Sequence, residues 1–238
     1  MKIVLLYLYP DLMNLYGSSG NMRCWVRHLM TAGAELEVRY RSVGEPIDFD
    51  GVHFVYIGAG TERSQKRALT DLLTVRDAFA RYIENGGFAL LCGNAGEMLG
   101  RRFVDLEGQT FEGLGIQNFE TVQEQRRTVC DVVCTCPLTS RKIIGFLNLQ
   151  SRMTPVENPL FQVIGGRGNA PDAPEEGFFD KNLFATHLSG PILIRNPHFR
   201  AMLENRLYTQ LDLPFTPQDL PYEQQAYEES LRSLEAAL

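Results

Sequence analysis

Few residues of this chain of 238 could carry nucleophilic, acid–base or metal chemistry. Its thiols and imidazoles are Cys24, Cys92, Cys130, Cys134, Cys136, His28, His53, His187 and His198. Cys130, Cys134 and Cys136 alternate along a strand-like segment and share one face, which favours a buried group of thiols over a metal site. Their spacing lacks a CxxC pair and no histidine lies nearby, so we expect no metal and no other cofactor.

One segment has the pattern of a nucleophile elbow. In Phe88-Ala-Leu-Leu-Cys92-Gly93-Asn94-Ala-Gly-Glu97, a buried strand enters a sharp turn of small residues and then a helix start. Such a turn lifts one side chain to the carboxyl edge of a sheet, where helix N–H groups stabilise a thiolate or an oxyanion. The base of such a site follows a later strand, and Thr186-His187-Leu188-Ser189-Gly190-Pro191 supplies a histidine there.

The composition is that of a globular protein, with 44% hydrophobic and 22% charged residues. A formal charge of -6, from 23 Lys and Arg against 29 Asp and Glu, disfavours binding to nucleic acids and to anionic membranes. No apolar run approaches the roughly 20 residues of a membrane helix. An odd number of cysteines without an export signal indicates reduced thiols. We therefore expect a cytoplasmic protein without a transmembrane segment or a nucleic-acid partner.

Two patterns indicate the elements that must position these residues. Up to about residue 100, apolar strand-like runs alternate with amphipathic helices, one of which we expect to run unbroken over residues 64–84. This alternation predicts an α/β fold with a mostly parallel central sheet flanked by helices. Later, short alternating runs predict added antiparallel strands. We expect one domain over residues 1–208, with a Pro-rich connector and a C-terminal helix over residues 209–238 packing on it.

Sequence segments spread over most of the chain carry a family resemblance. They are residues 8–21, 57–65, 83–100, 111–116, 145–148, 168–169 and 184–197. With them the chain resembles the class I glutamine amidotransferase family, in its cobyric-acid-synthase-like branch, and most closely the GatD glutaminase subunits of lipid II isoglutaminyl synthase. The resemblance implies the amidotransferase fold, hydrolysis of glutamine through a cysteine thioester, and a Mur-ligase-like partner, MurT. That partner uses ATP and the released ammonia to amidate the D-glutamate of lipid II in peptidoglycan synthesis.

The resemblance also assigns roles to residues around the elbow. Arg127 matches an arginine that helps to bind or admit glutamine. The loop Gly58-Ala59-Gly60 matches the one that helps to form an oxyanion hole. Asn94, in the elbow, is a further candidate for binding the substrate.

The chain departs from the family at both positions that carry the chemistry. The family's elbow reads Cys-Gly-Gly-Tyr-Gln-Leu-Leu-Gly, and without gaps its cysteine falls on Gly93, while Cys92 lies one residue early. In a strand this offset turns the side chain to the opposite face, toward a helix layer. The family's histidine, in Tyr-Leu-His-Gly-Pro, falls on Ser189. His187 lies two residues upstream, about 6–7 Å along the strand, beyond hydrogen-bond reach.

Three hypotheses follow. The chain is a GatD-like subunit that keeps fold, pocket and partner surface but has lost the glutaminase dyad. Alternatively, it is an active glutaminase that uses the displaced Cys92 and His187. In the third hypothesis, the chain is a non-catalytic sensor that binds glutamine or a cell-wall fragment in the cleft that serves as the active site in the family.

Overall fold

The structure, a computed structural model, describes residues 2–218 and 220–237. Its elements in chain order are β1 (Lys2–Leu8), η1 (Leu15–Gly17), α1 (Ser19–Thr31), β2 (Glu35–Arg41), β3 (Phe54–Ile57), α2 (Glu62–Leu72), η2 (Leu73–Val75), α3 (Arg76–Glu84), β4 (Phe88–Cys92), η3 (Gly93–Leu99), β5 (Arg102–Val104), β6 (Thr110–Glu112), β7 (Glu120–Thr135), β8 (Ile143–Thr154), β9 (Phe161–Gly165), β10 (Glu175–Glu176), β11 (Phe178–Asp180), β12 (Leu183–Thr186), α4 (Ile192–Arg195), α5 (Pro197–Gln210) and α6 (Pro221–Ala237). The elements labelled η are 3-10 helices.

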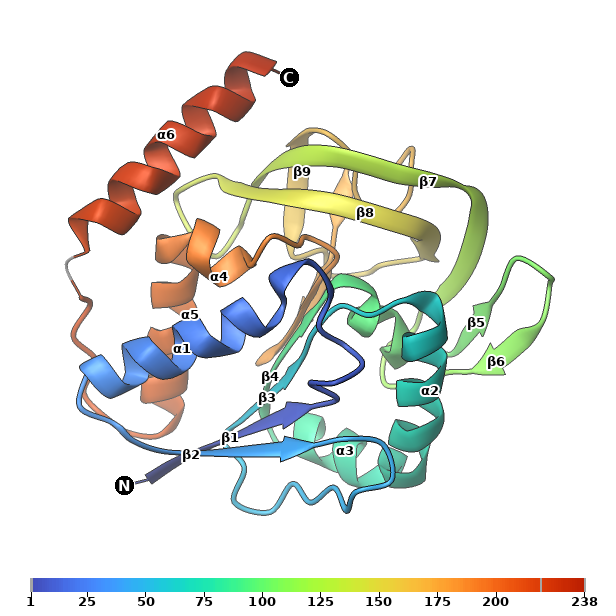
Figure 1. Ribbon diagram of the computed structural model, residues 1–238, viewed down its shortest axis with the longest axis horizontal. Coiled ribbons are helices and arrows are strands. Elements are labelled where there is room, and N and C mark those ends of the chain that lie inside the picture. The colour runs from blue at the N-terminus through green and yellow to red at the C-terminus, as the bar shows by residue number, and fades with distance from the viewer. Residues whose placement is uncertain (1, 219, 238) are drawn as a thin grey trace.

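The central sheet has the strand order β11-β12-β4-β3-β1-β2. All its pairs are parallel except the edge pair β11–β12. Helices cover both faces, as Figure 1 shows with α1 and α5 on one side and α2 and α3 on the other. The expected α/β fold with a mostly parallel sheet between helices is therefore confirmed.

Alternate residues of each central strand enter two different cores. In β4, Phe88, Leu90 and Cys92 pack with α1, α4 and α5, whereas Ala89 and Leu91 pack with α2, α3 and η3. Because strand side chains alternate between faces, a shift of one residue decides which helix layer a side chain joins.

A second sheet supplies the wall that faces the carboxyl edge of the central sheet. Its order is β10-β9-β7-β5-β6, with β8 paired antiparallel to β7. In Figure 1 the β7–β8 ribbon passes above the loops that follow the central strands. An isolated bridge between Phe146 of β8 and Ser189 ties the ribbon to the segment after β12.

The expectation of one unbroken helix over residues 64–84 is wrong. The segment forms α2, the 3-10 turn η2 and α3, with Val75 at φ -119° outside helical geometry. The hydroxyl of Thr74 donates a hydrogen bond of 2.6 Å to the carbonyl of Asp71. Thr side chains that bond nearby carbonyls compete with the helical ladder, which the apolar periodicity alone does not reveal.

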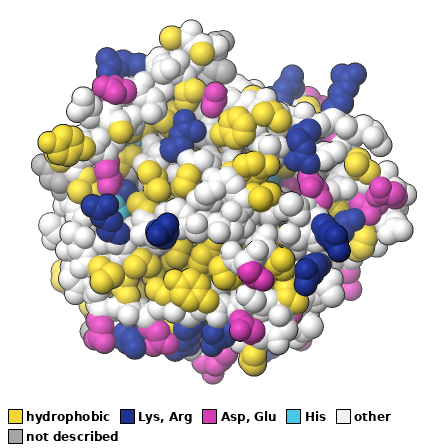
Figure 2. Space-filling view, viewed as in Figure 1, with side chains coloured by type: hydrophobic (Ala, Val, Ile, Leu, Met, Phe, Trp, Pro, Cys, Tyr) yellow, Lys and Arg dark blue, Asp and Glu magenta, His cyan; other side chains and the backbone are white. Residues whose placement is uncertain are grey.

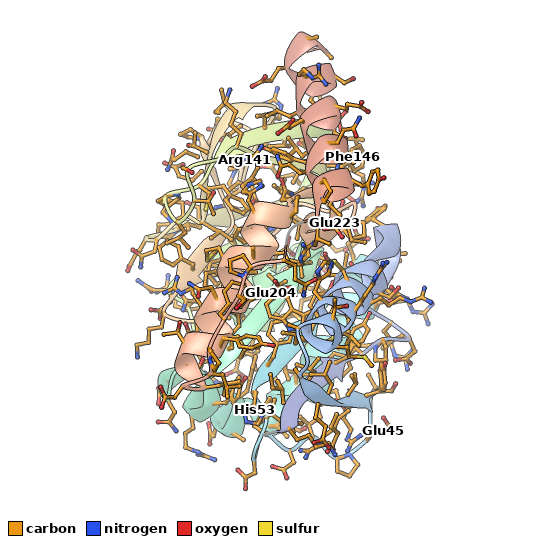
Figure 3. The ribbon with its side chains drawn as sticks, turned by 90° about the vertical axis from the view of Figure 1, so that its left-hand side faces the viewer. Glu45, His53, Arg141, Phe146, Glu204 and Glu223 are labelled. Atoms are coloured by element: carbon orange, nitrogen blue, oxygen red, sulfur yellow. The ribbon has the colours of Figure 1, made fainter. Side chains whose placement is uncertain are left out.

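The C-terminal helix α6 packs on the β7–β8 ribbon. Tyr227 is 3% exposed and contacts Val133 and Ile144. Its hydroxyl donates a hydrogen bond of 2.7 Å to the carbonyl of Lys142. Figure 3 shows Glu223 at the lower end of α6 near Glu204 of α5.

The surface mixes both signs of charge. Figure 2 shows Lys and Arg side chains interspersed with Asp and Glu across one face. Among the residues that the structure describes, no helix is both long and apolar enough to cross a membrane.

Candidate active site

A cavity of about 260 Å³ lies at the carboxyl edge of the central sheet, beneath β8. The loops after β3, β4 and β12 form its floor, and polar residues of β8 form its wall. The residues named by the sequence that line it are Ala59, Gly60, Gly93, Asn94, Arg127, His187 and Ser189. The fold thus gathers the candidate residues, except Cys92 and Gly58, around one space.

Gly93 retains the backbone of an elbow but has no side chain to present. It follows β4 directly with a φ of +63°, in the left-handed region that favours glycine. A Cβ added to Gly93 would lie 2.4 Å from the Cβ of Ala59 and 3.0 Å from its Cα. The methyl group of Ala59 therefore occupies the space that a nucleophile at position 93 would need.

The loop after β3 has no free donors at positions 59 and 60. The N–H of Ala59 donates to the Ser18 hydroxyl at 2.9 Å. The N–H of Gly60 donates to the Oδ1 atom of Asn94 at 3.0 Å. An oxyanion would have to displace these two acceptors before it could bind the N–H groups of Ala59 and Gly60.

Cys92 lies in the core rather than in the cavity, as its one-residue offset predicts. It is 1% exposed, and its sulfur lies 3.6 Å from the Nδ2 atom of Asn21 in α1. Burial raises the pKa of this thiol to about 12. A thiol so far from ionisation is a poor nucleophile.

Ser189 is held by the second sheet. Its hydroxyl donates a hydrogen bond of 2.9 Å to the carbonyl of Phe146, and its backbone N–H donates to the same oxygen at 2.8 Å. A base at this position would face the cavity, but a serine bonded to a carbonyl does not accept a proton.

His187 lies between two buried carboxylates. Its Nε2 is 3.5 Å from Oε1 of Glu97, and its Nδ1 is 3.4 Å from Oε1 of Glu176. Burial alone would lower the pKa of His187, but the two carboxylates outweigh burial and raise it to about 9. At neutral pH this imidazole is protonated, so it is not available as a general base.

Each carboxylate is fixed by further partners. Glu97 accepts a hydrogen bond of 2.7 Å from Nε2 of Gln65 and another from the hydroxyl of Ser151. Glu176 accepts a hydrogen bond of 2.7 Å from the hydroxyl of Thr186 and one of 2.6 Å from the backbone N–H of His187. We call Glu97, His187 and Glu176 the buried cluster.

Arg127 of β7 lies at the mouth of the cavity. Its guanidinium forms an ion pair with Glu62 and donates hydrogen bonds to Gln150 and, at 3.0 Å, to Asn148. The side chain is about one-third exposed, so a carboxylate entering from solvent could reach it.

Comparison with known proteins decides the family. The sequence profile of the CobB/CobQ-like glutamine amidotransferase domain matches residues 5–197. The chain belongs to this family.

Two of the similar proteins are GatD subunits from different organisms. The lipid II isoglutaminyl synthase (glutamine-hydrolyzing) subunit GatD of Staphylococcus aureus is 29% identical over 93% of this chain and 91% of the relative. The subunit of the same name from Streptococcus pneumoniae is 32% identical over 85% of this chain and 78% of the relative. The cobyric acid synthase of Listeria innocua is more distant, at 26% identity over 81% of this chain and 38% of that protein.

Solved structures agree on the fold. PurLQS from Thermotoga maritima superposes with a TM-score of 0.53 at 14% identity, covering 88% of this chain and 97% of that chain. A glutamine amidotransferase of the same organism gives 0.53 at 7% identity, covering 98% and 92%. At such identities the likeness shows the fold of this family alone.

Sequence reasoning missed most of the buried cluster. Glu97 belongs to the elbow segment, where the family motif has a glutamine, so the replacement of an uncharged residue by a carboxylate was visible. Glu176 comes from the two-residue strand β10 and carries no motif. Only the fold brings it beside His187.

Proposed function

We propose that the chain is a GatD-like subunit that pairs with a MurT-like Mur ligase in amidating the D-glutamate of lipid II. In this proposal it does not release ammonia from glutamine through the family's Cys–His pair. The ligase then takes free ammonia. The names of the GatD relatives supply the reaction and the subunit role.

The observation that carries the proposal is the contact between Gly93 and Ala59. The elbow keeps its left-handed backbone, yet the place of the nucleophile's Cβ is taken by a methyl group 2.4 Å away. The bond from Gly60 to Asn94 closes the adjoining loop in the same way. The region around the elbow is thus altered at several residues and not only at position 93. A single chance substitution does not explain this.

The active-glutaminase alternative requires Cys92 and His187 to meet. Cys92 pairs with Thr186 in the sheet and packs in the core with α1, whereas His187 lines the cavity. Among the described residues, no hydrogen bond joins the two side chains. The pKa values, about 12 for Cys92 and about 9 for His187, favour a neutral thiol and a protonated imidazole.

The test is reconstitution with the Mur-ligase-like protein of the same source. We expect the two proteins to co-purify, and lipid II to be amidated with ammonium chloride but not with glutamine as the nitrogen donor. Cys92→Ala should behave as the wild type in both assays. Amidation from glutamine that Cys92→Ala abolishes would establish the alternative instead, and failure to co-purify would refute the partnership.

The sensor hypothesis differs in one measurable respect. The cavity and Arg127 remain, so glutamine could bind without turnover. Glutamine at millimolar concentration would then raise the melting temperature of the isolated chain. No shift at saturating glutamine would contradict the sensor hypothesis and leave the partnership unaffected.

A further inference from the structure

The buried cluster at the floor of the cavity carries more negative than positive charge. Glu97, Glu176 and His187 are each at most 4% exposed. Glu97 and His187 line the cavity, whereas Glu176 does not line it and contacts the other ring nitrogen of His187. Two carboxylates face one imidazole, so one formal negative charge remains in the buried cluster even when the imidazole is protonated. In the described part of the chain, Arg127 is the only Lys or Arg that lines the cavity, and it is paired with Glu62 at the mouth. A buried charge without compensation is costly, so this floor favours a cation.

The floor also has unused hydrogen-bonding capacity. A carboxylate can accept about four hydrogen bonds, whereas Glu97 accepts one from Gln65 and one from Ser151. Both ring nitrogens of His187 are buried and make no hydrogen bond to any residue that the structure describes. Their contacts with the carboxylates, at 3.4 and 3.5 Å, are longer than hydrogen bonds.

The cation that suits this cavity is one with N–H hydrogen-bond donors rather than a metal ion. Within residues 2–218 and 220–237, no group of three or more His, Cys, Asp and Glu side chains is arranged to hold a metal. A primary ammonium group supplies a positive charge and three N–H donors, and the free ammonium ion supplies four. It can donate to the acceptor positions of Glu97 that no residue uses.

We propose that this cavity binds a primary ammonium group against Glu97, attracted by the net negative charge of the buried cluster. The family motif has a glutamine at position 97, so the charge that recognises the ligand is a departure of this chain from that motif. The volume of about 260 Å³ admits either the free ammonium ion or a small amino acid with a terminal ammonium group. In the second case its carboxylate would reach Arg127. This inference requires neither a nucleophile nor a partner.

Thermal melts and titration calorimetry on the full chain test the proposal. The probes are ammonium chloride, lysine and ornithine at constant ionic strength, with sodium chloride, tetramethylammonium chloride and norleucine as controls. Norleucine has the carbon chain and the α-ammonium group of lysine but lacks the ammonium group at the end of the side chain. At ten times the dissociation constant, a binding probe should raise the melting temperature by roughly 3–6 °C, and the controls should not.

Two variants locate the site. Glu97→Gln keeps the shape and removes the charge, and it should weaken binding by about tenfold or more. Glu112→Gln, at an exposed carboxylate of β6 that pairs with Arg76, is the matched control and should bind as the wild type. If Glu97→Gln fails to fold, the comparison of lysine with norleucine on the wild type shows whether the side-chain ammonium group is recognised.

The outcomes separate the sources of the ligand and the two proposals. A response to ammonium chloride alone identifies the free ion, and a response to lysine or ornithine alone identifies the amino acid. No response to any ammonium probe, or an equal response to sodium, tetramethylammonium or norleucine, overturns the inference. Glutaminase activity would refute the proposed function but would not alter these melts.

Discussion

The contact between Ala59 and Gly93 allows a quantitative test of why position 93 of the elbow carries no side chain. A side chain at position 93 meets two penalties. An L-residue at φ +63° costs about 1–2 kcal/mol, because its Cβ approaches its own backbone. The approach of 2.4 Å to the Cβ of Ala59 adds about 1–3 kcal/mol of overpacking. Gly93→Ala should therefore lower the free energy of unfolding by about 2–5 kcal/mol, and the melting temperature by roughly 5–15 °C.

A matched control separates the two penalties. Gly86 has a φ of +84°, and a Cβ added there meets nothing within 4 Å. Gly86→Ala therefore measures the backbone penalty alone, whereas Gly93→Ala measures both. Adding Ala59→Gly to Gly93→Ala should recover the steric part, about 1–3 kcal/mol. Denaturant melts of these variants supply the comparison.

The same geometry predicts how activity could be restored. Gly93→Cys with Ser189→His should remain inactive as a glutaminase, because Ala59 displaces the new thiol. Adding Ala59→Gly should let activity appear, measured as glutamate released from glutamine. The reasoning is refuted if Gly93→Ala costs no more than Gly86→Ala, or if Ala59→Gly recovers no stability.

Three further predictions concern other parts of the molecule. Because the pKa of His187 is raised to about 9, its stabilising charge is fully present below its unfolded pKa of about 6.5 and is lost as the pH rises toward 9. His187→Gln should flatten melting temperature against pH in that window, and an unchanged slope would contradict this account. Cys92, with a pKa of about 12, should not react with a thiol reagent at pH 8 in the folded protein, whereas all five thiols should react after unfolding. Rapid labelling of Cys92 before unfolding would show that it is accessible. Tyr227→Ala should destabilise by about 3–4 kcal/mol and expose α6 to limited proteolysis, while Tyr227→Phe, which loses one hydrogen bond, should cost about 1 kcal/mol. Equal protease resistance of both variants would mean that Tyr227 does not hold α6.

The sequence could predict features that depend only on the order of elements along the chain or on the alternation of side chains within a strand. Alternating strands and helices with short connections allow few arrangements, so the mostly parallel sheet could be predicted. The orientation of Cys92 could also be predicted, because the side chains of a strand alternate with a period of two. That rule needs only the position of Cys92 relative to the elbow. The break between α2 and α3 could not be found in this way, because apolar periodicity continues across it while Thr74 bonds the backbone.

Tertiary structure decided what fills the site. The methyl group of Ala59 lies against Gly93, and Asn94 bonds Gly60, across separations of more than 30 residues. His187 meets Glu97 from 90 residues away. These contacts form where loops after separate strands meet at one edge of the sheet. The sequence by itself predicted that Gly93 and Ser189 stand at the positions of the family's nucleophile and base. Only the folded chain places the methyl group of Ala59 against Gly93 and the buried carboxylate of Glu97 on the cavity floor, because those distances depend on how the strands are paired.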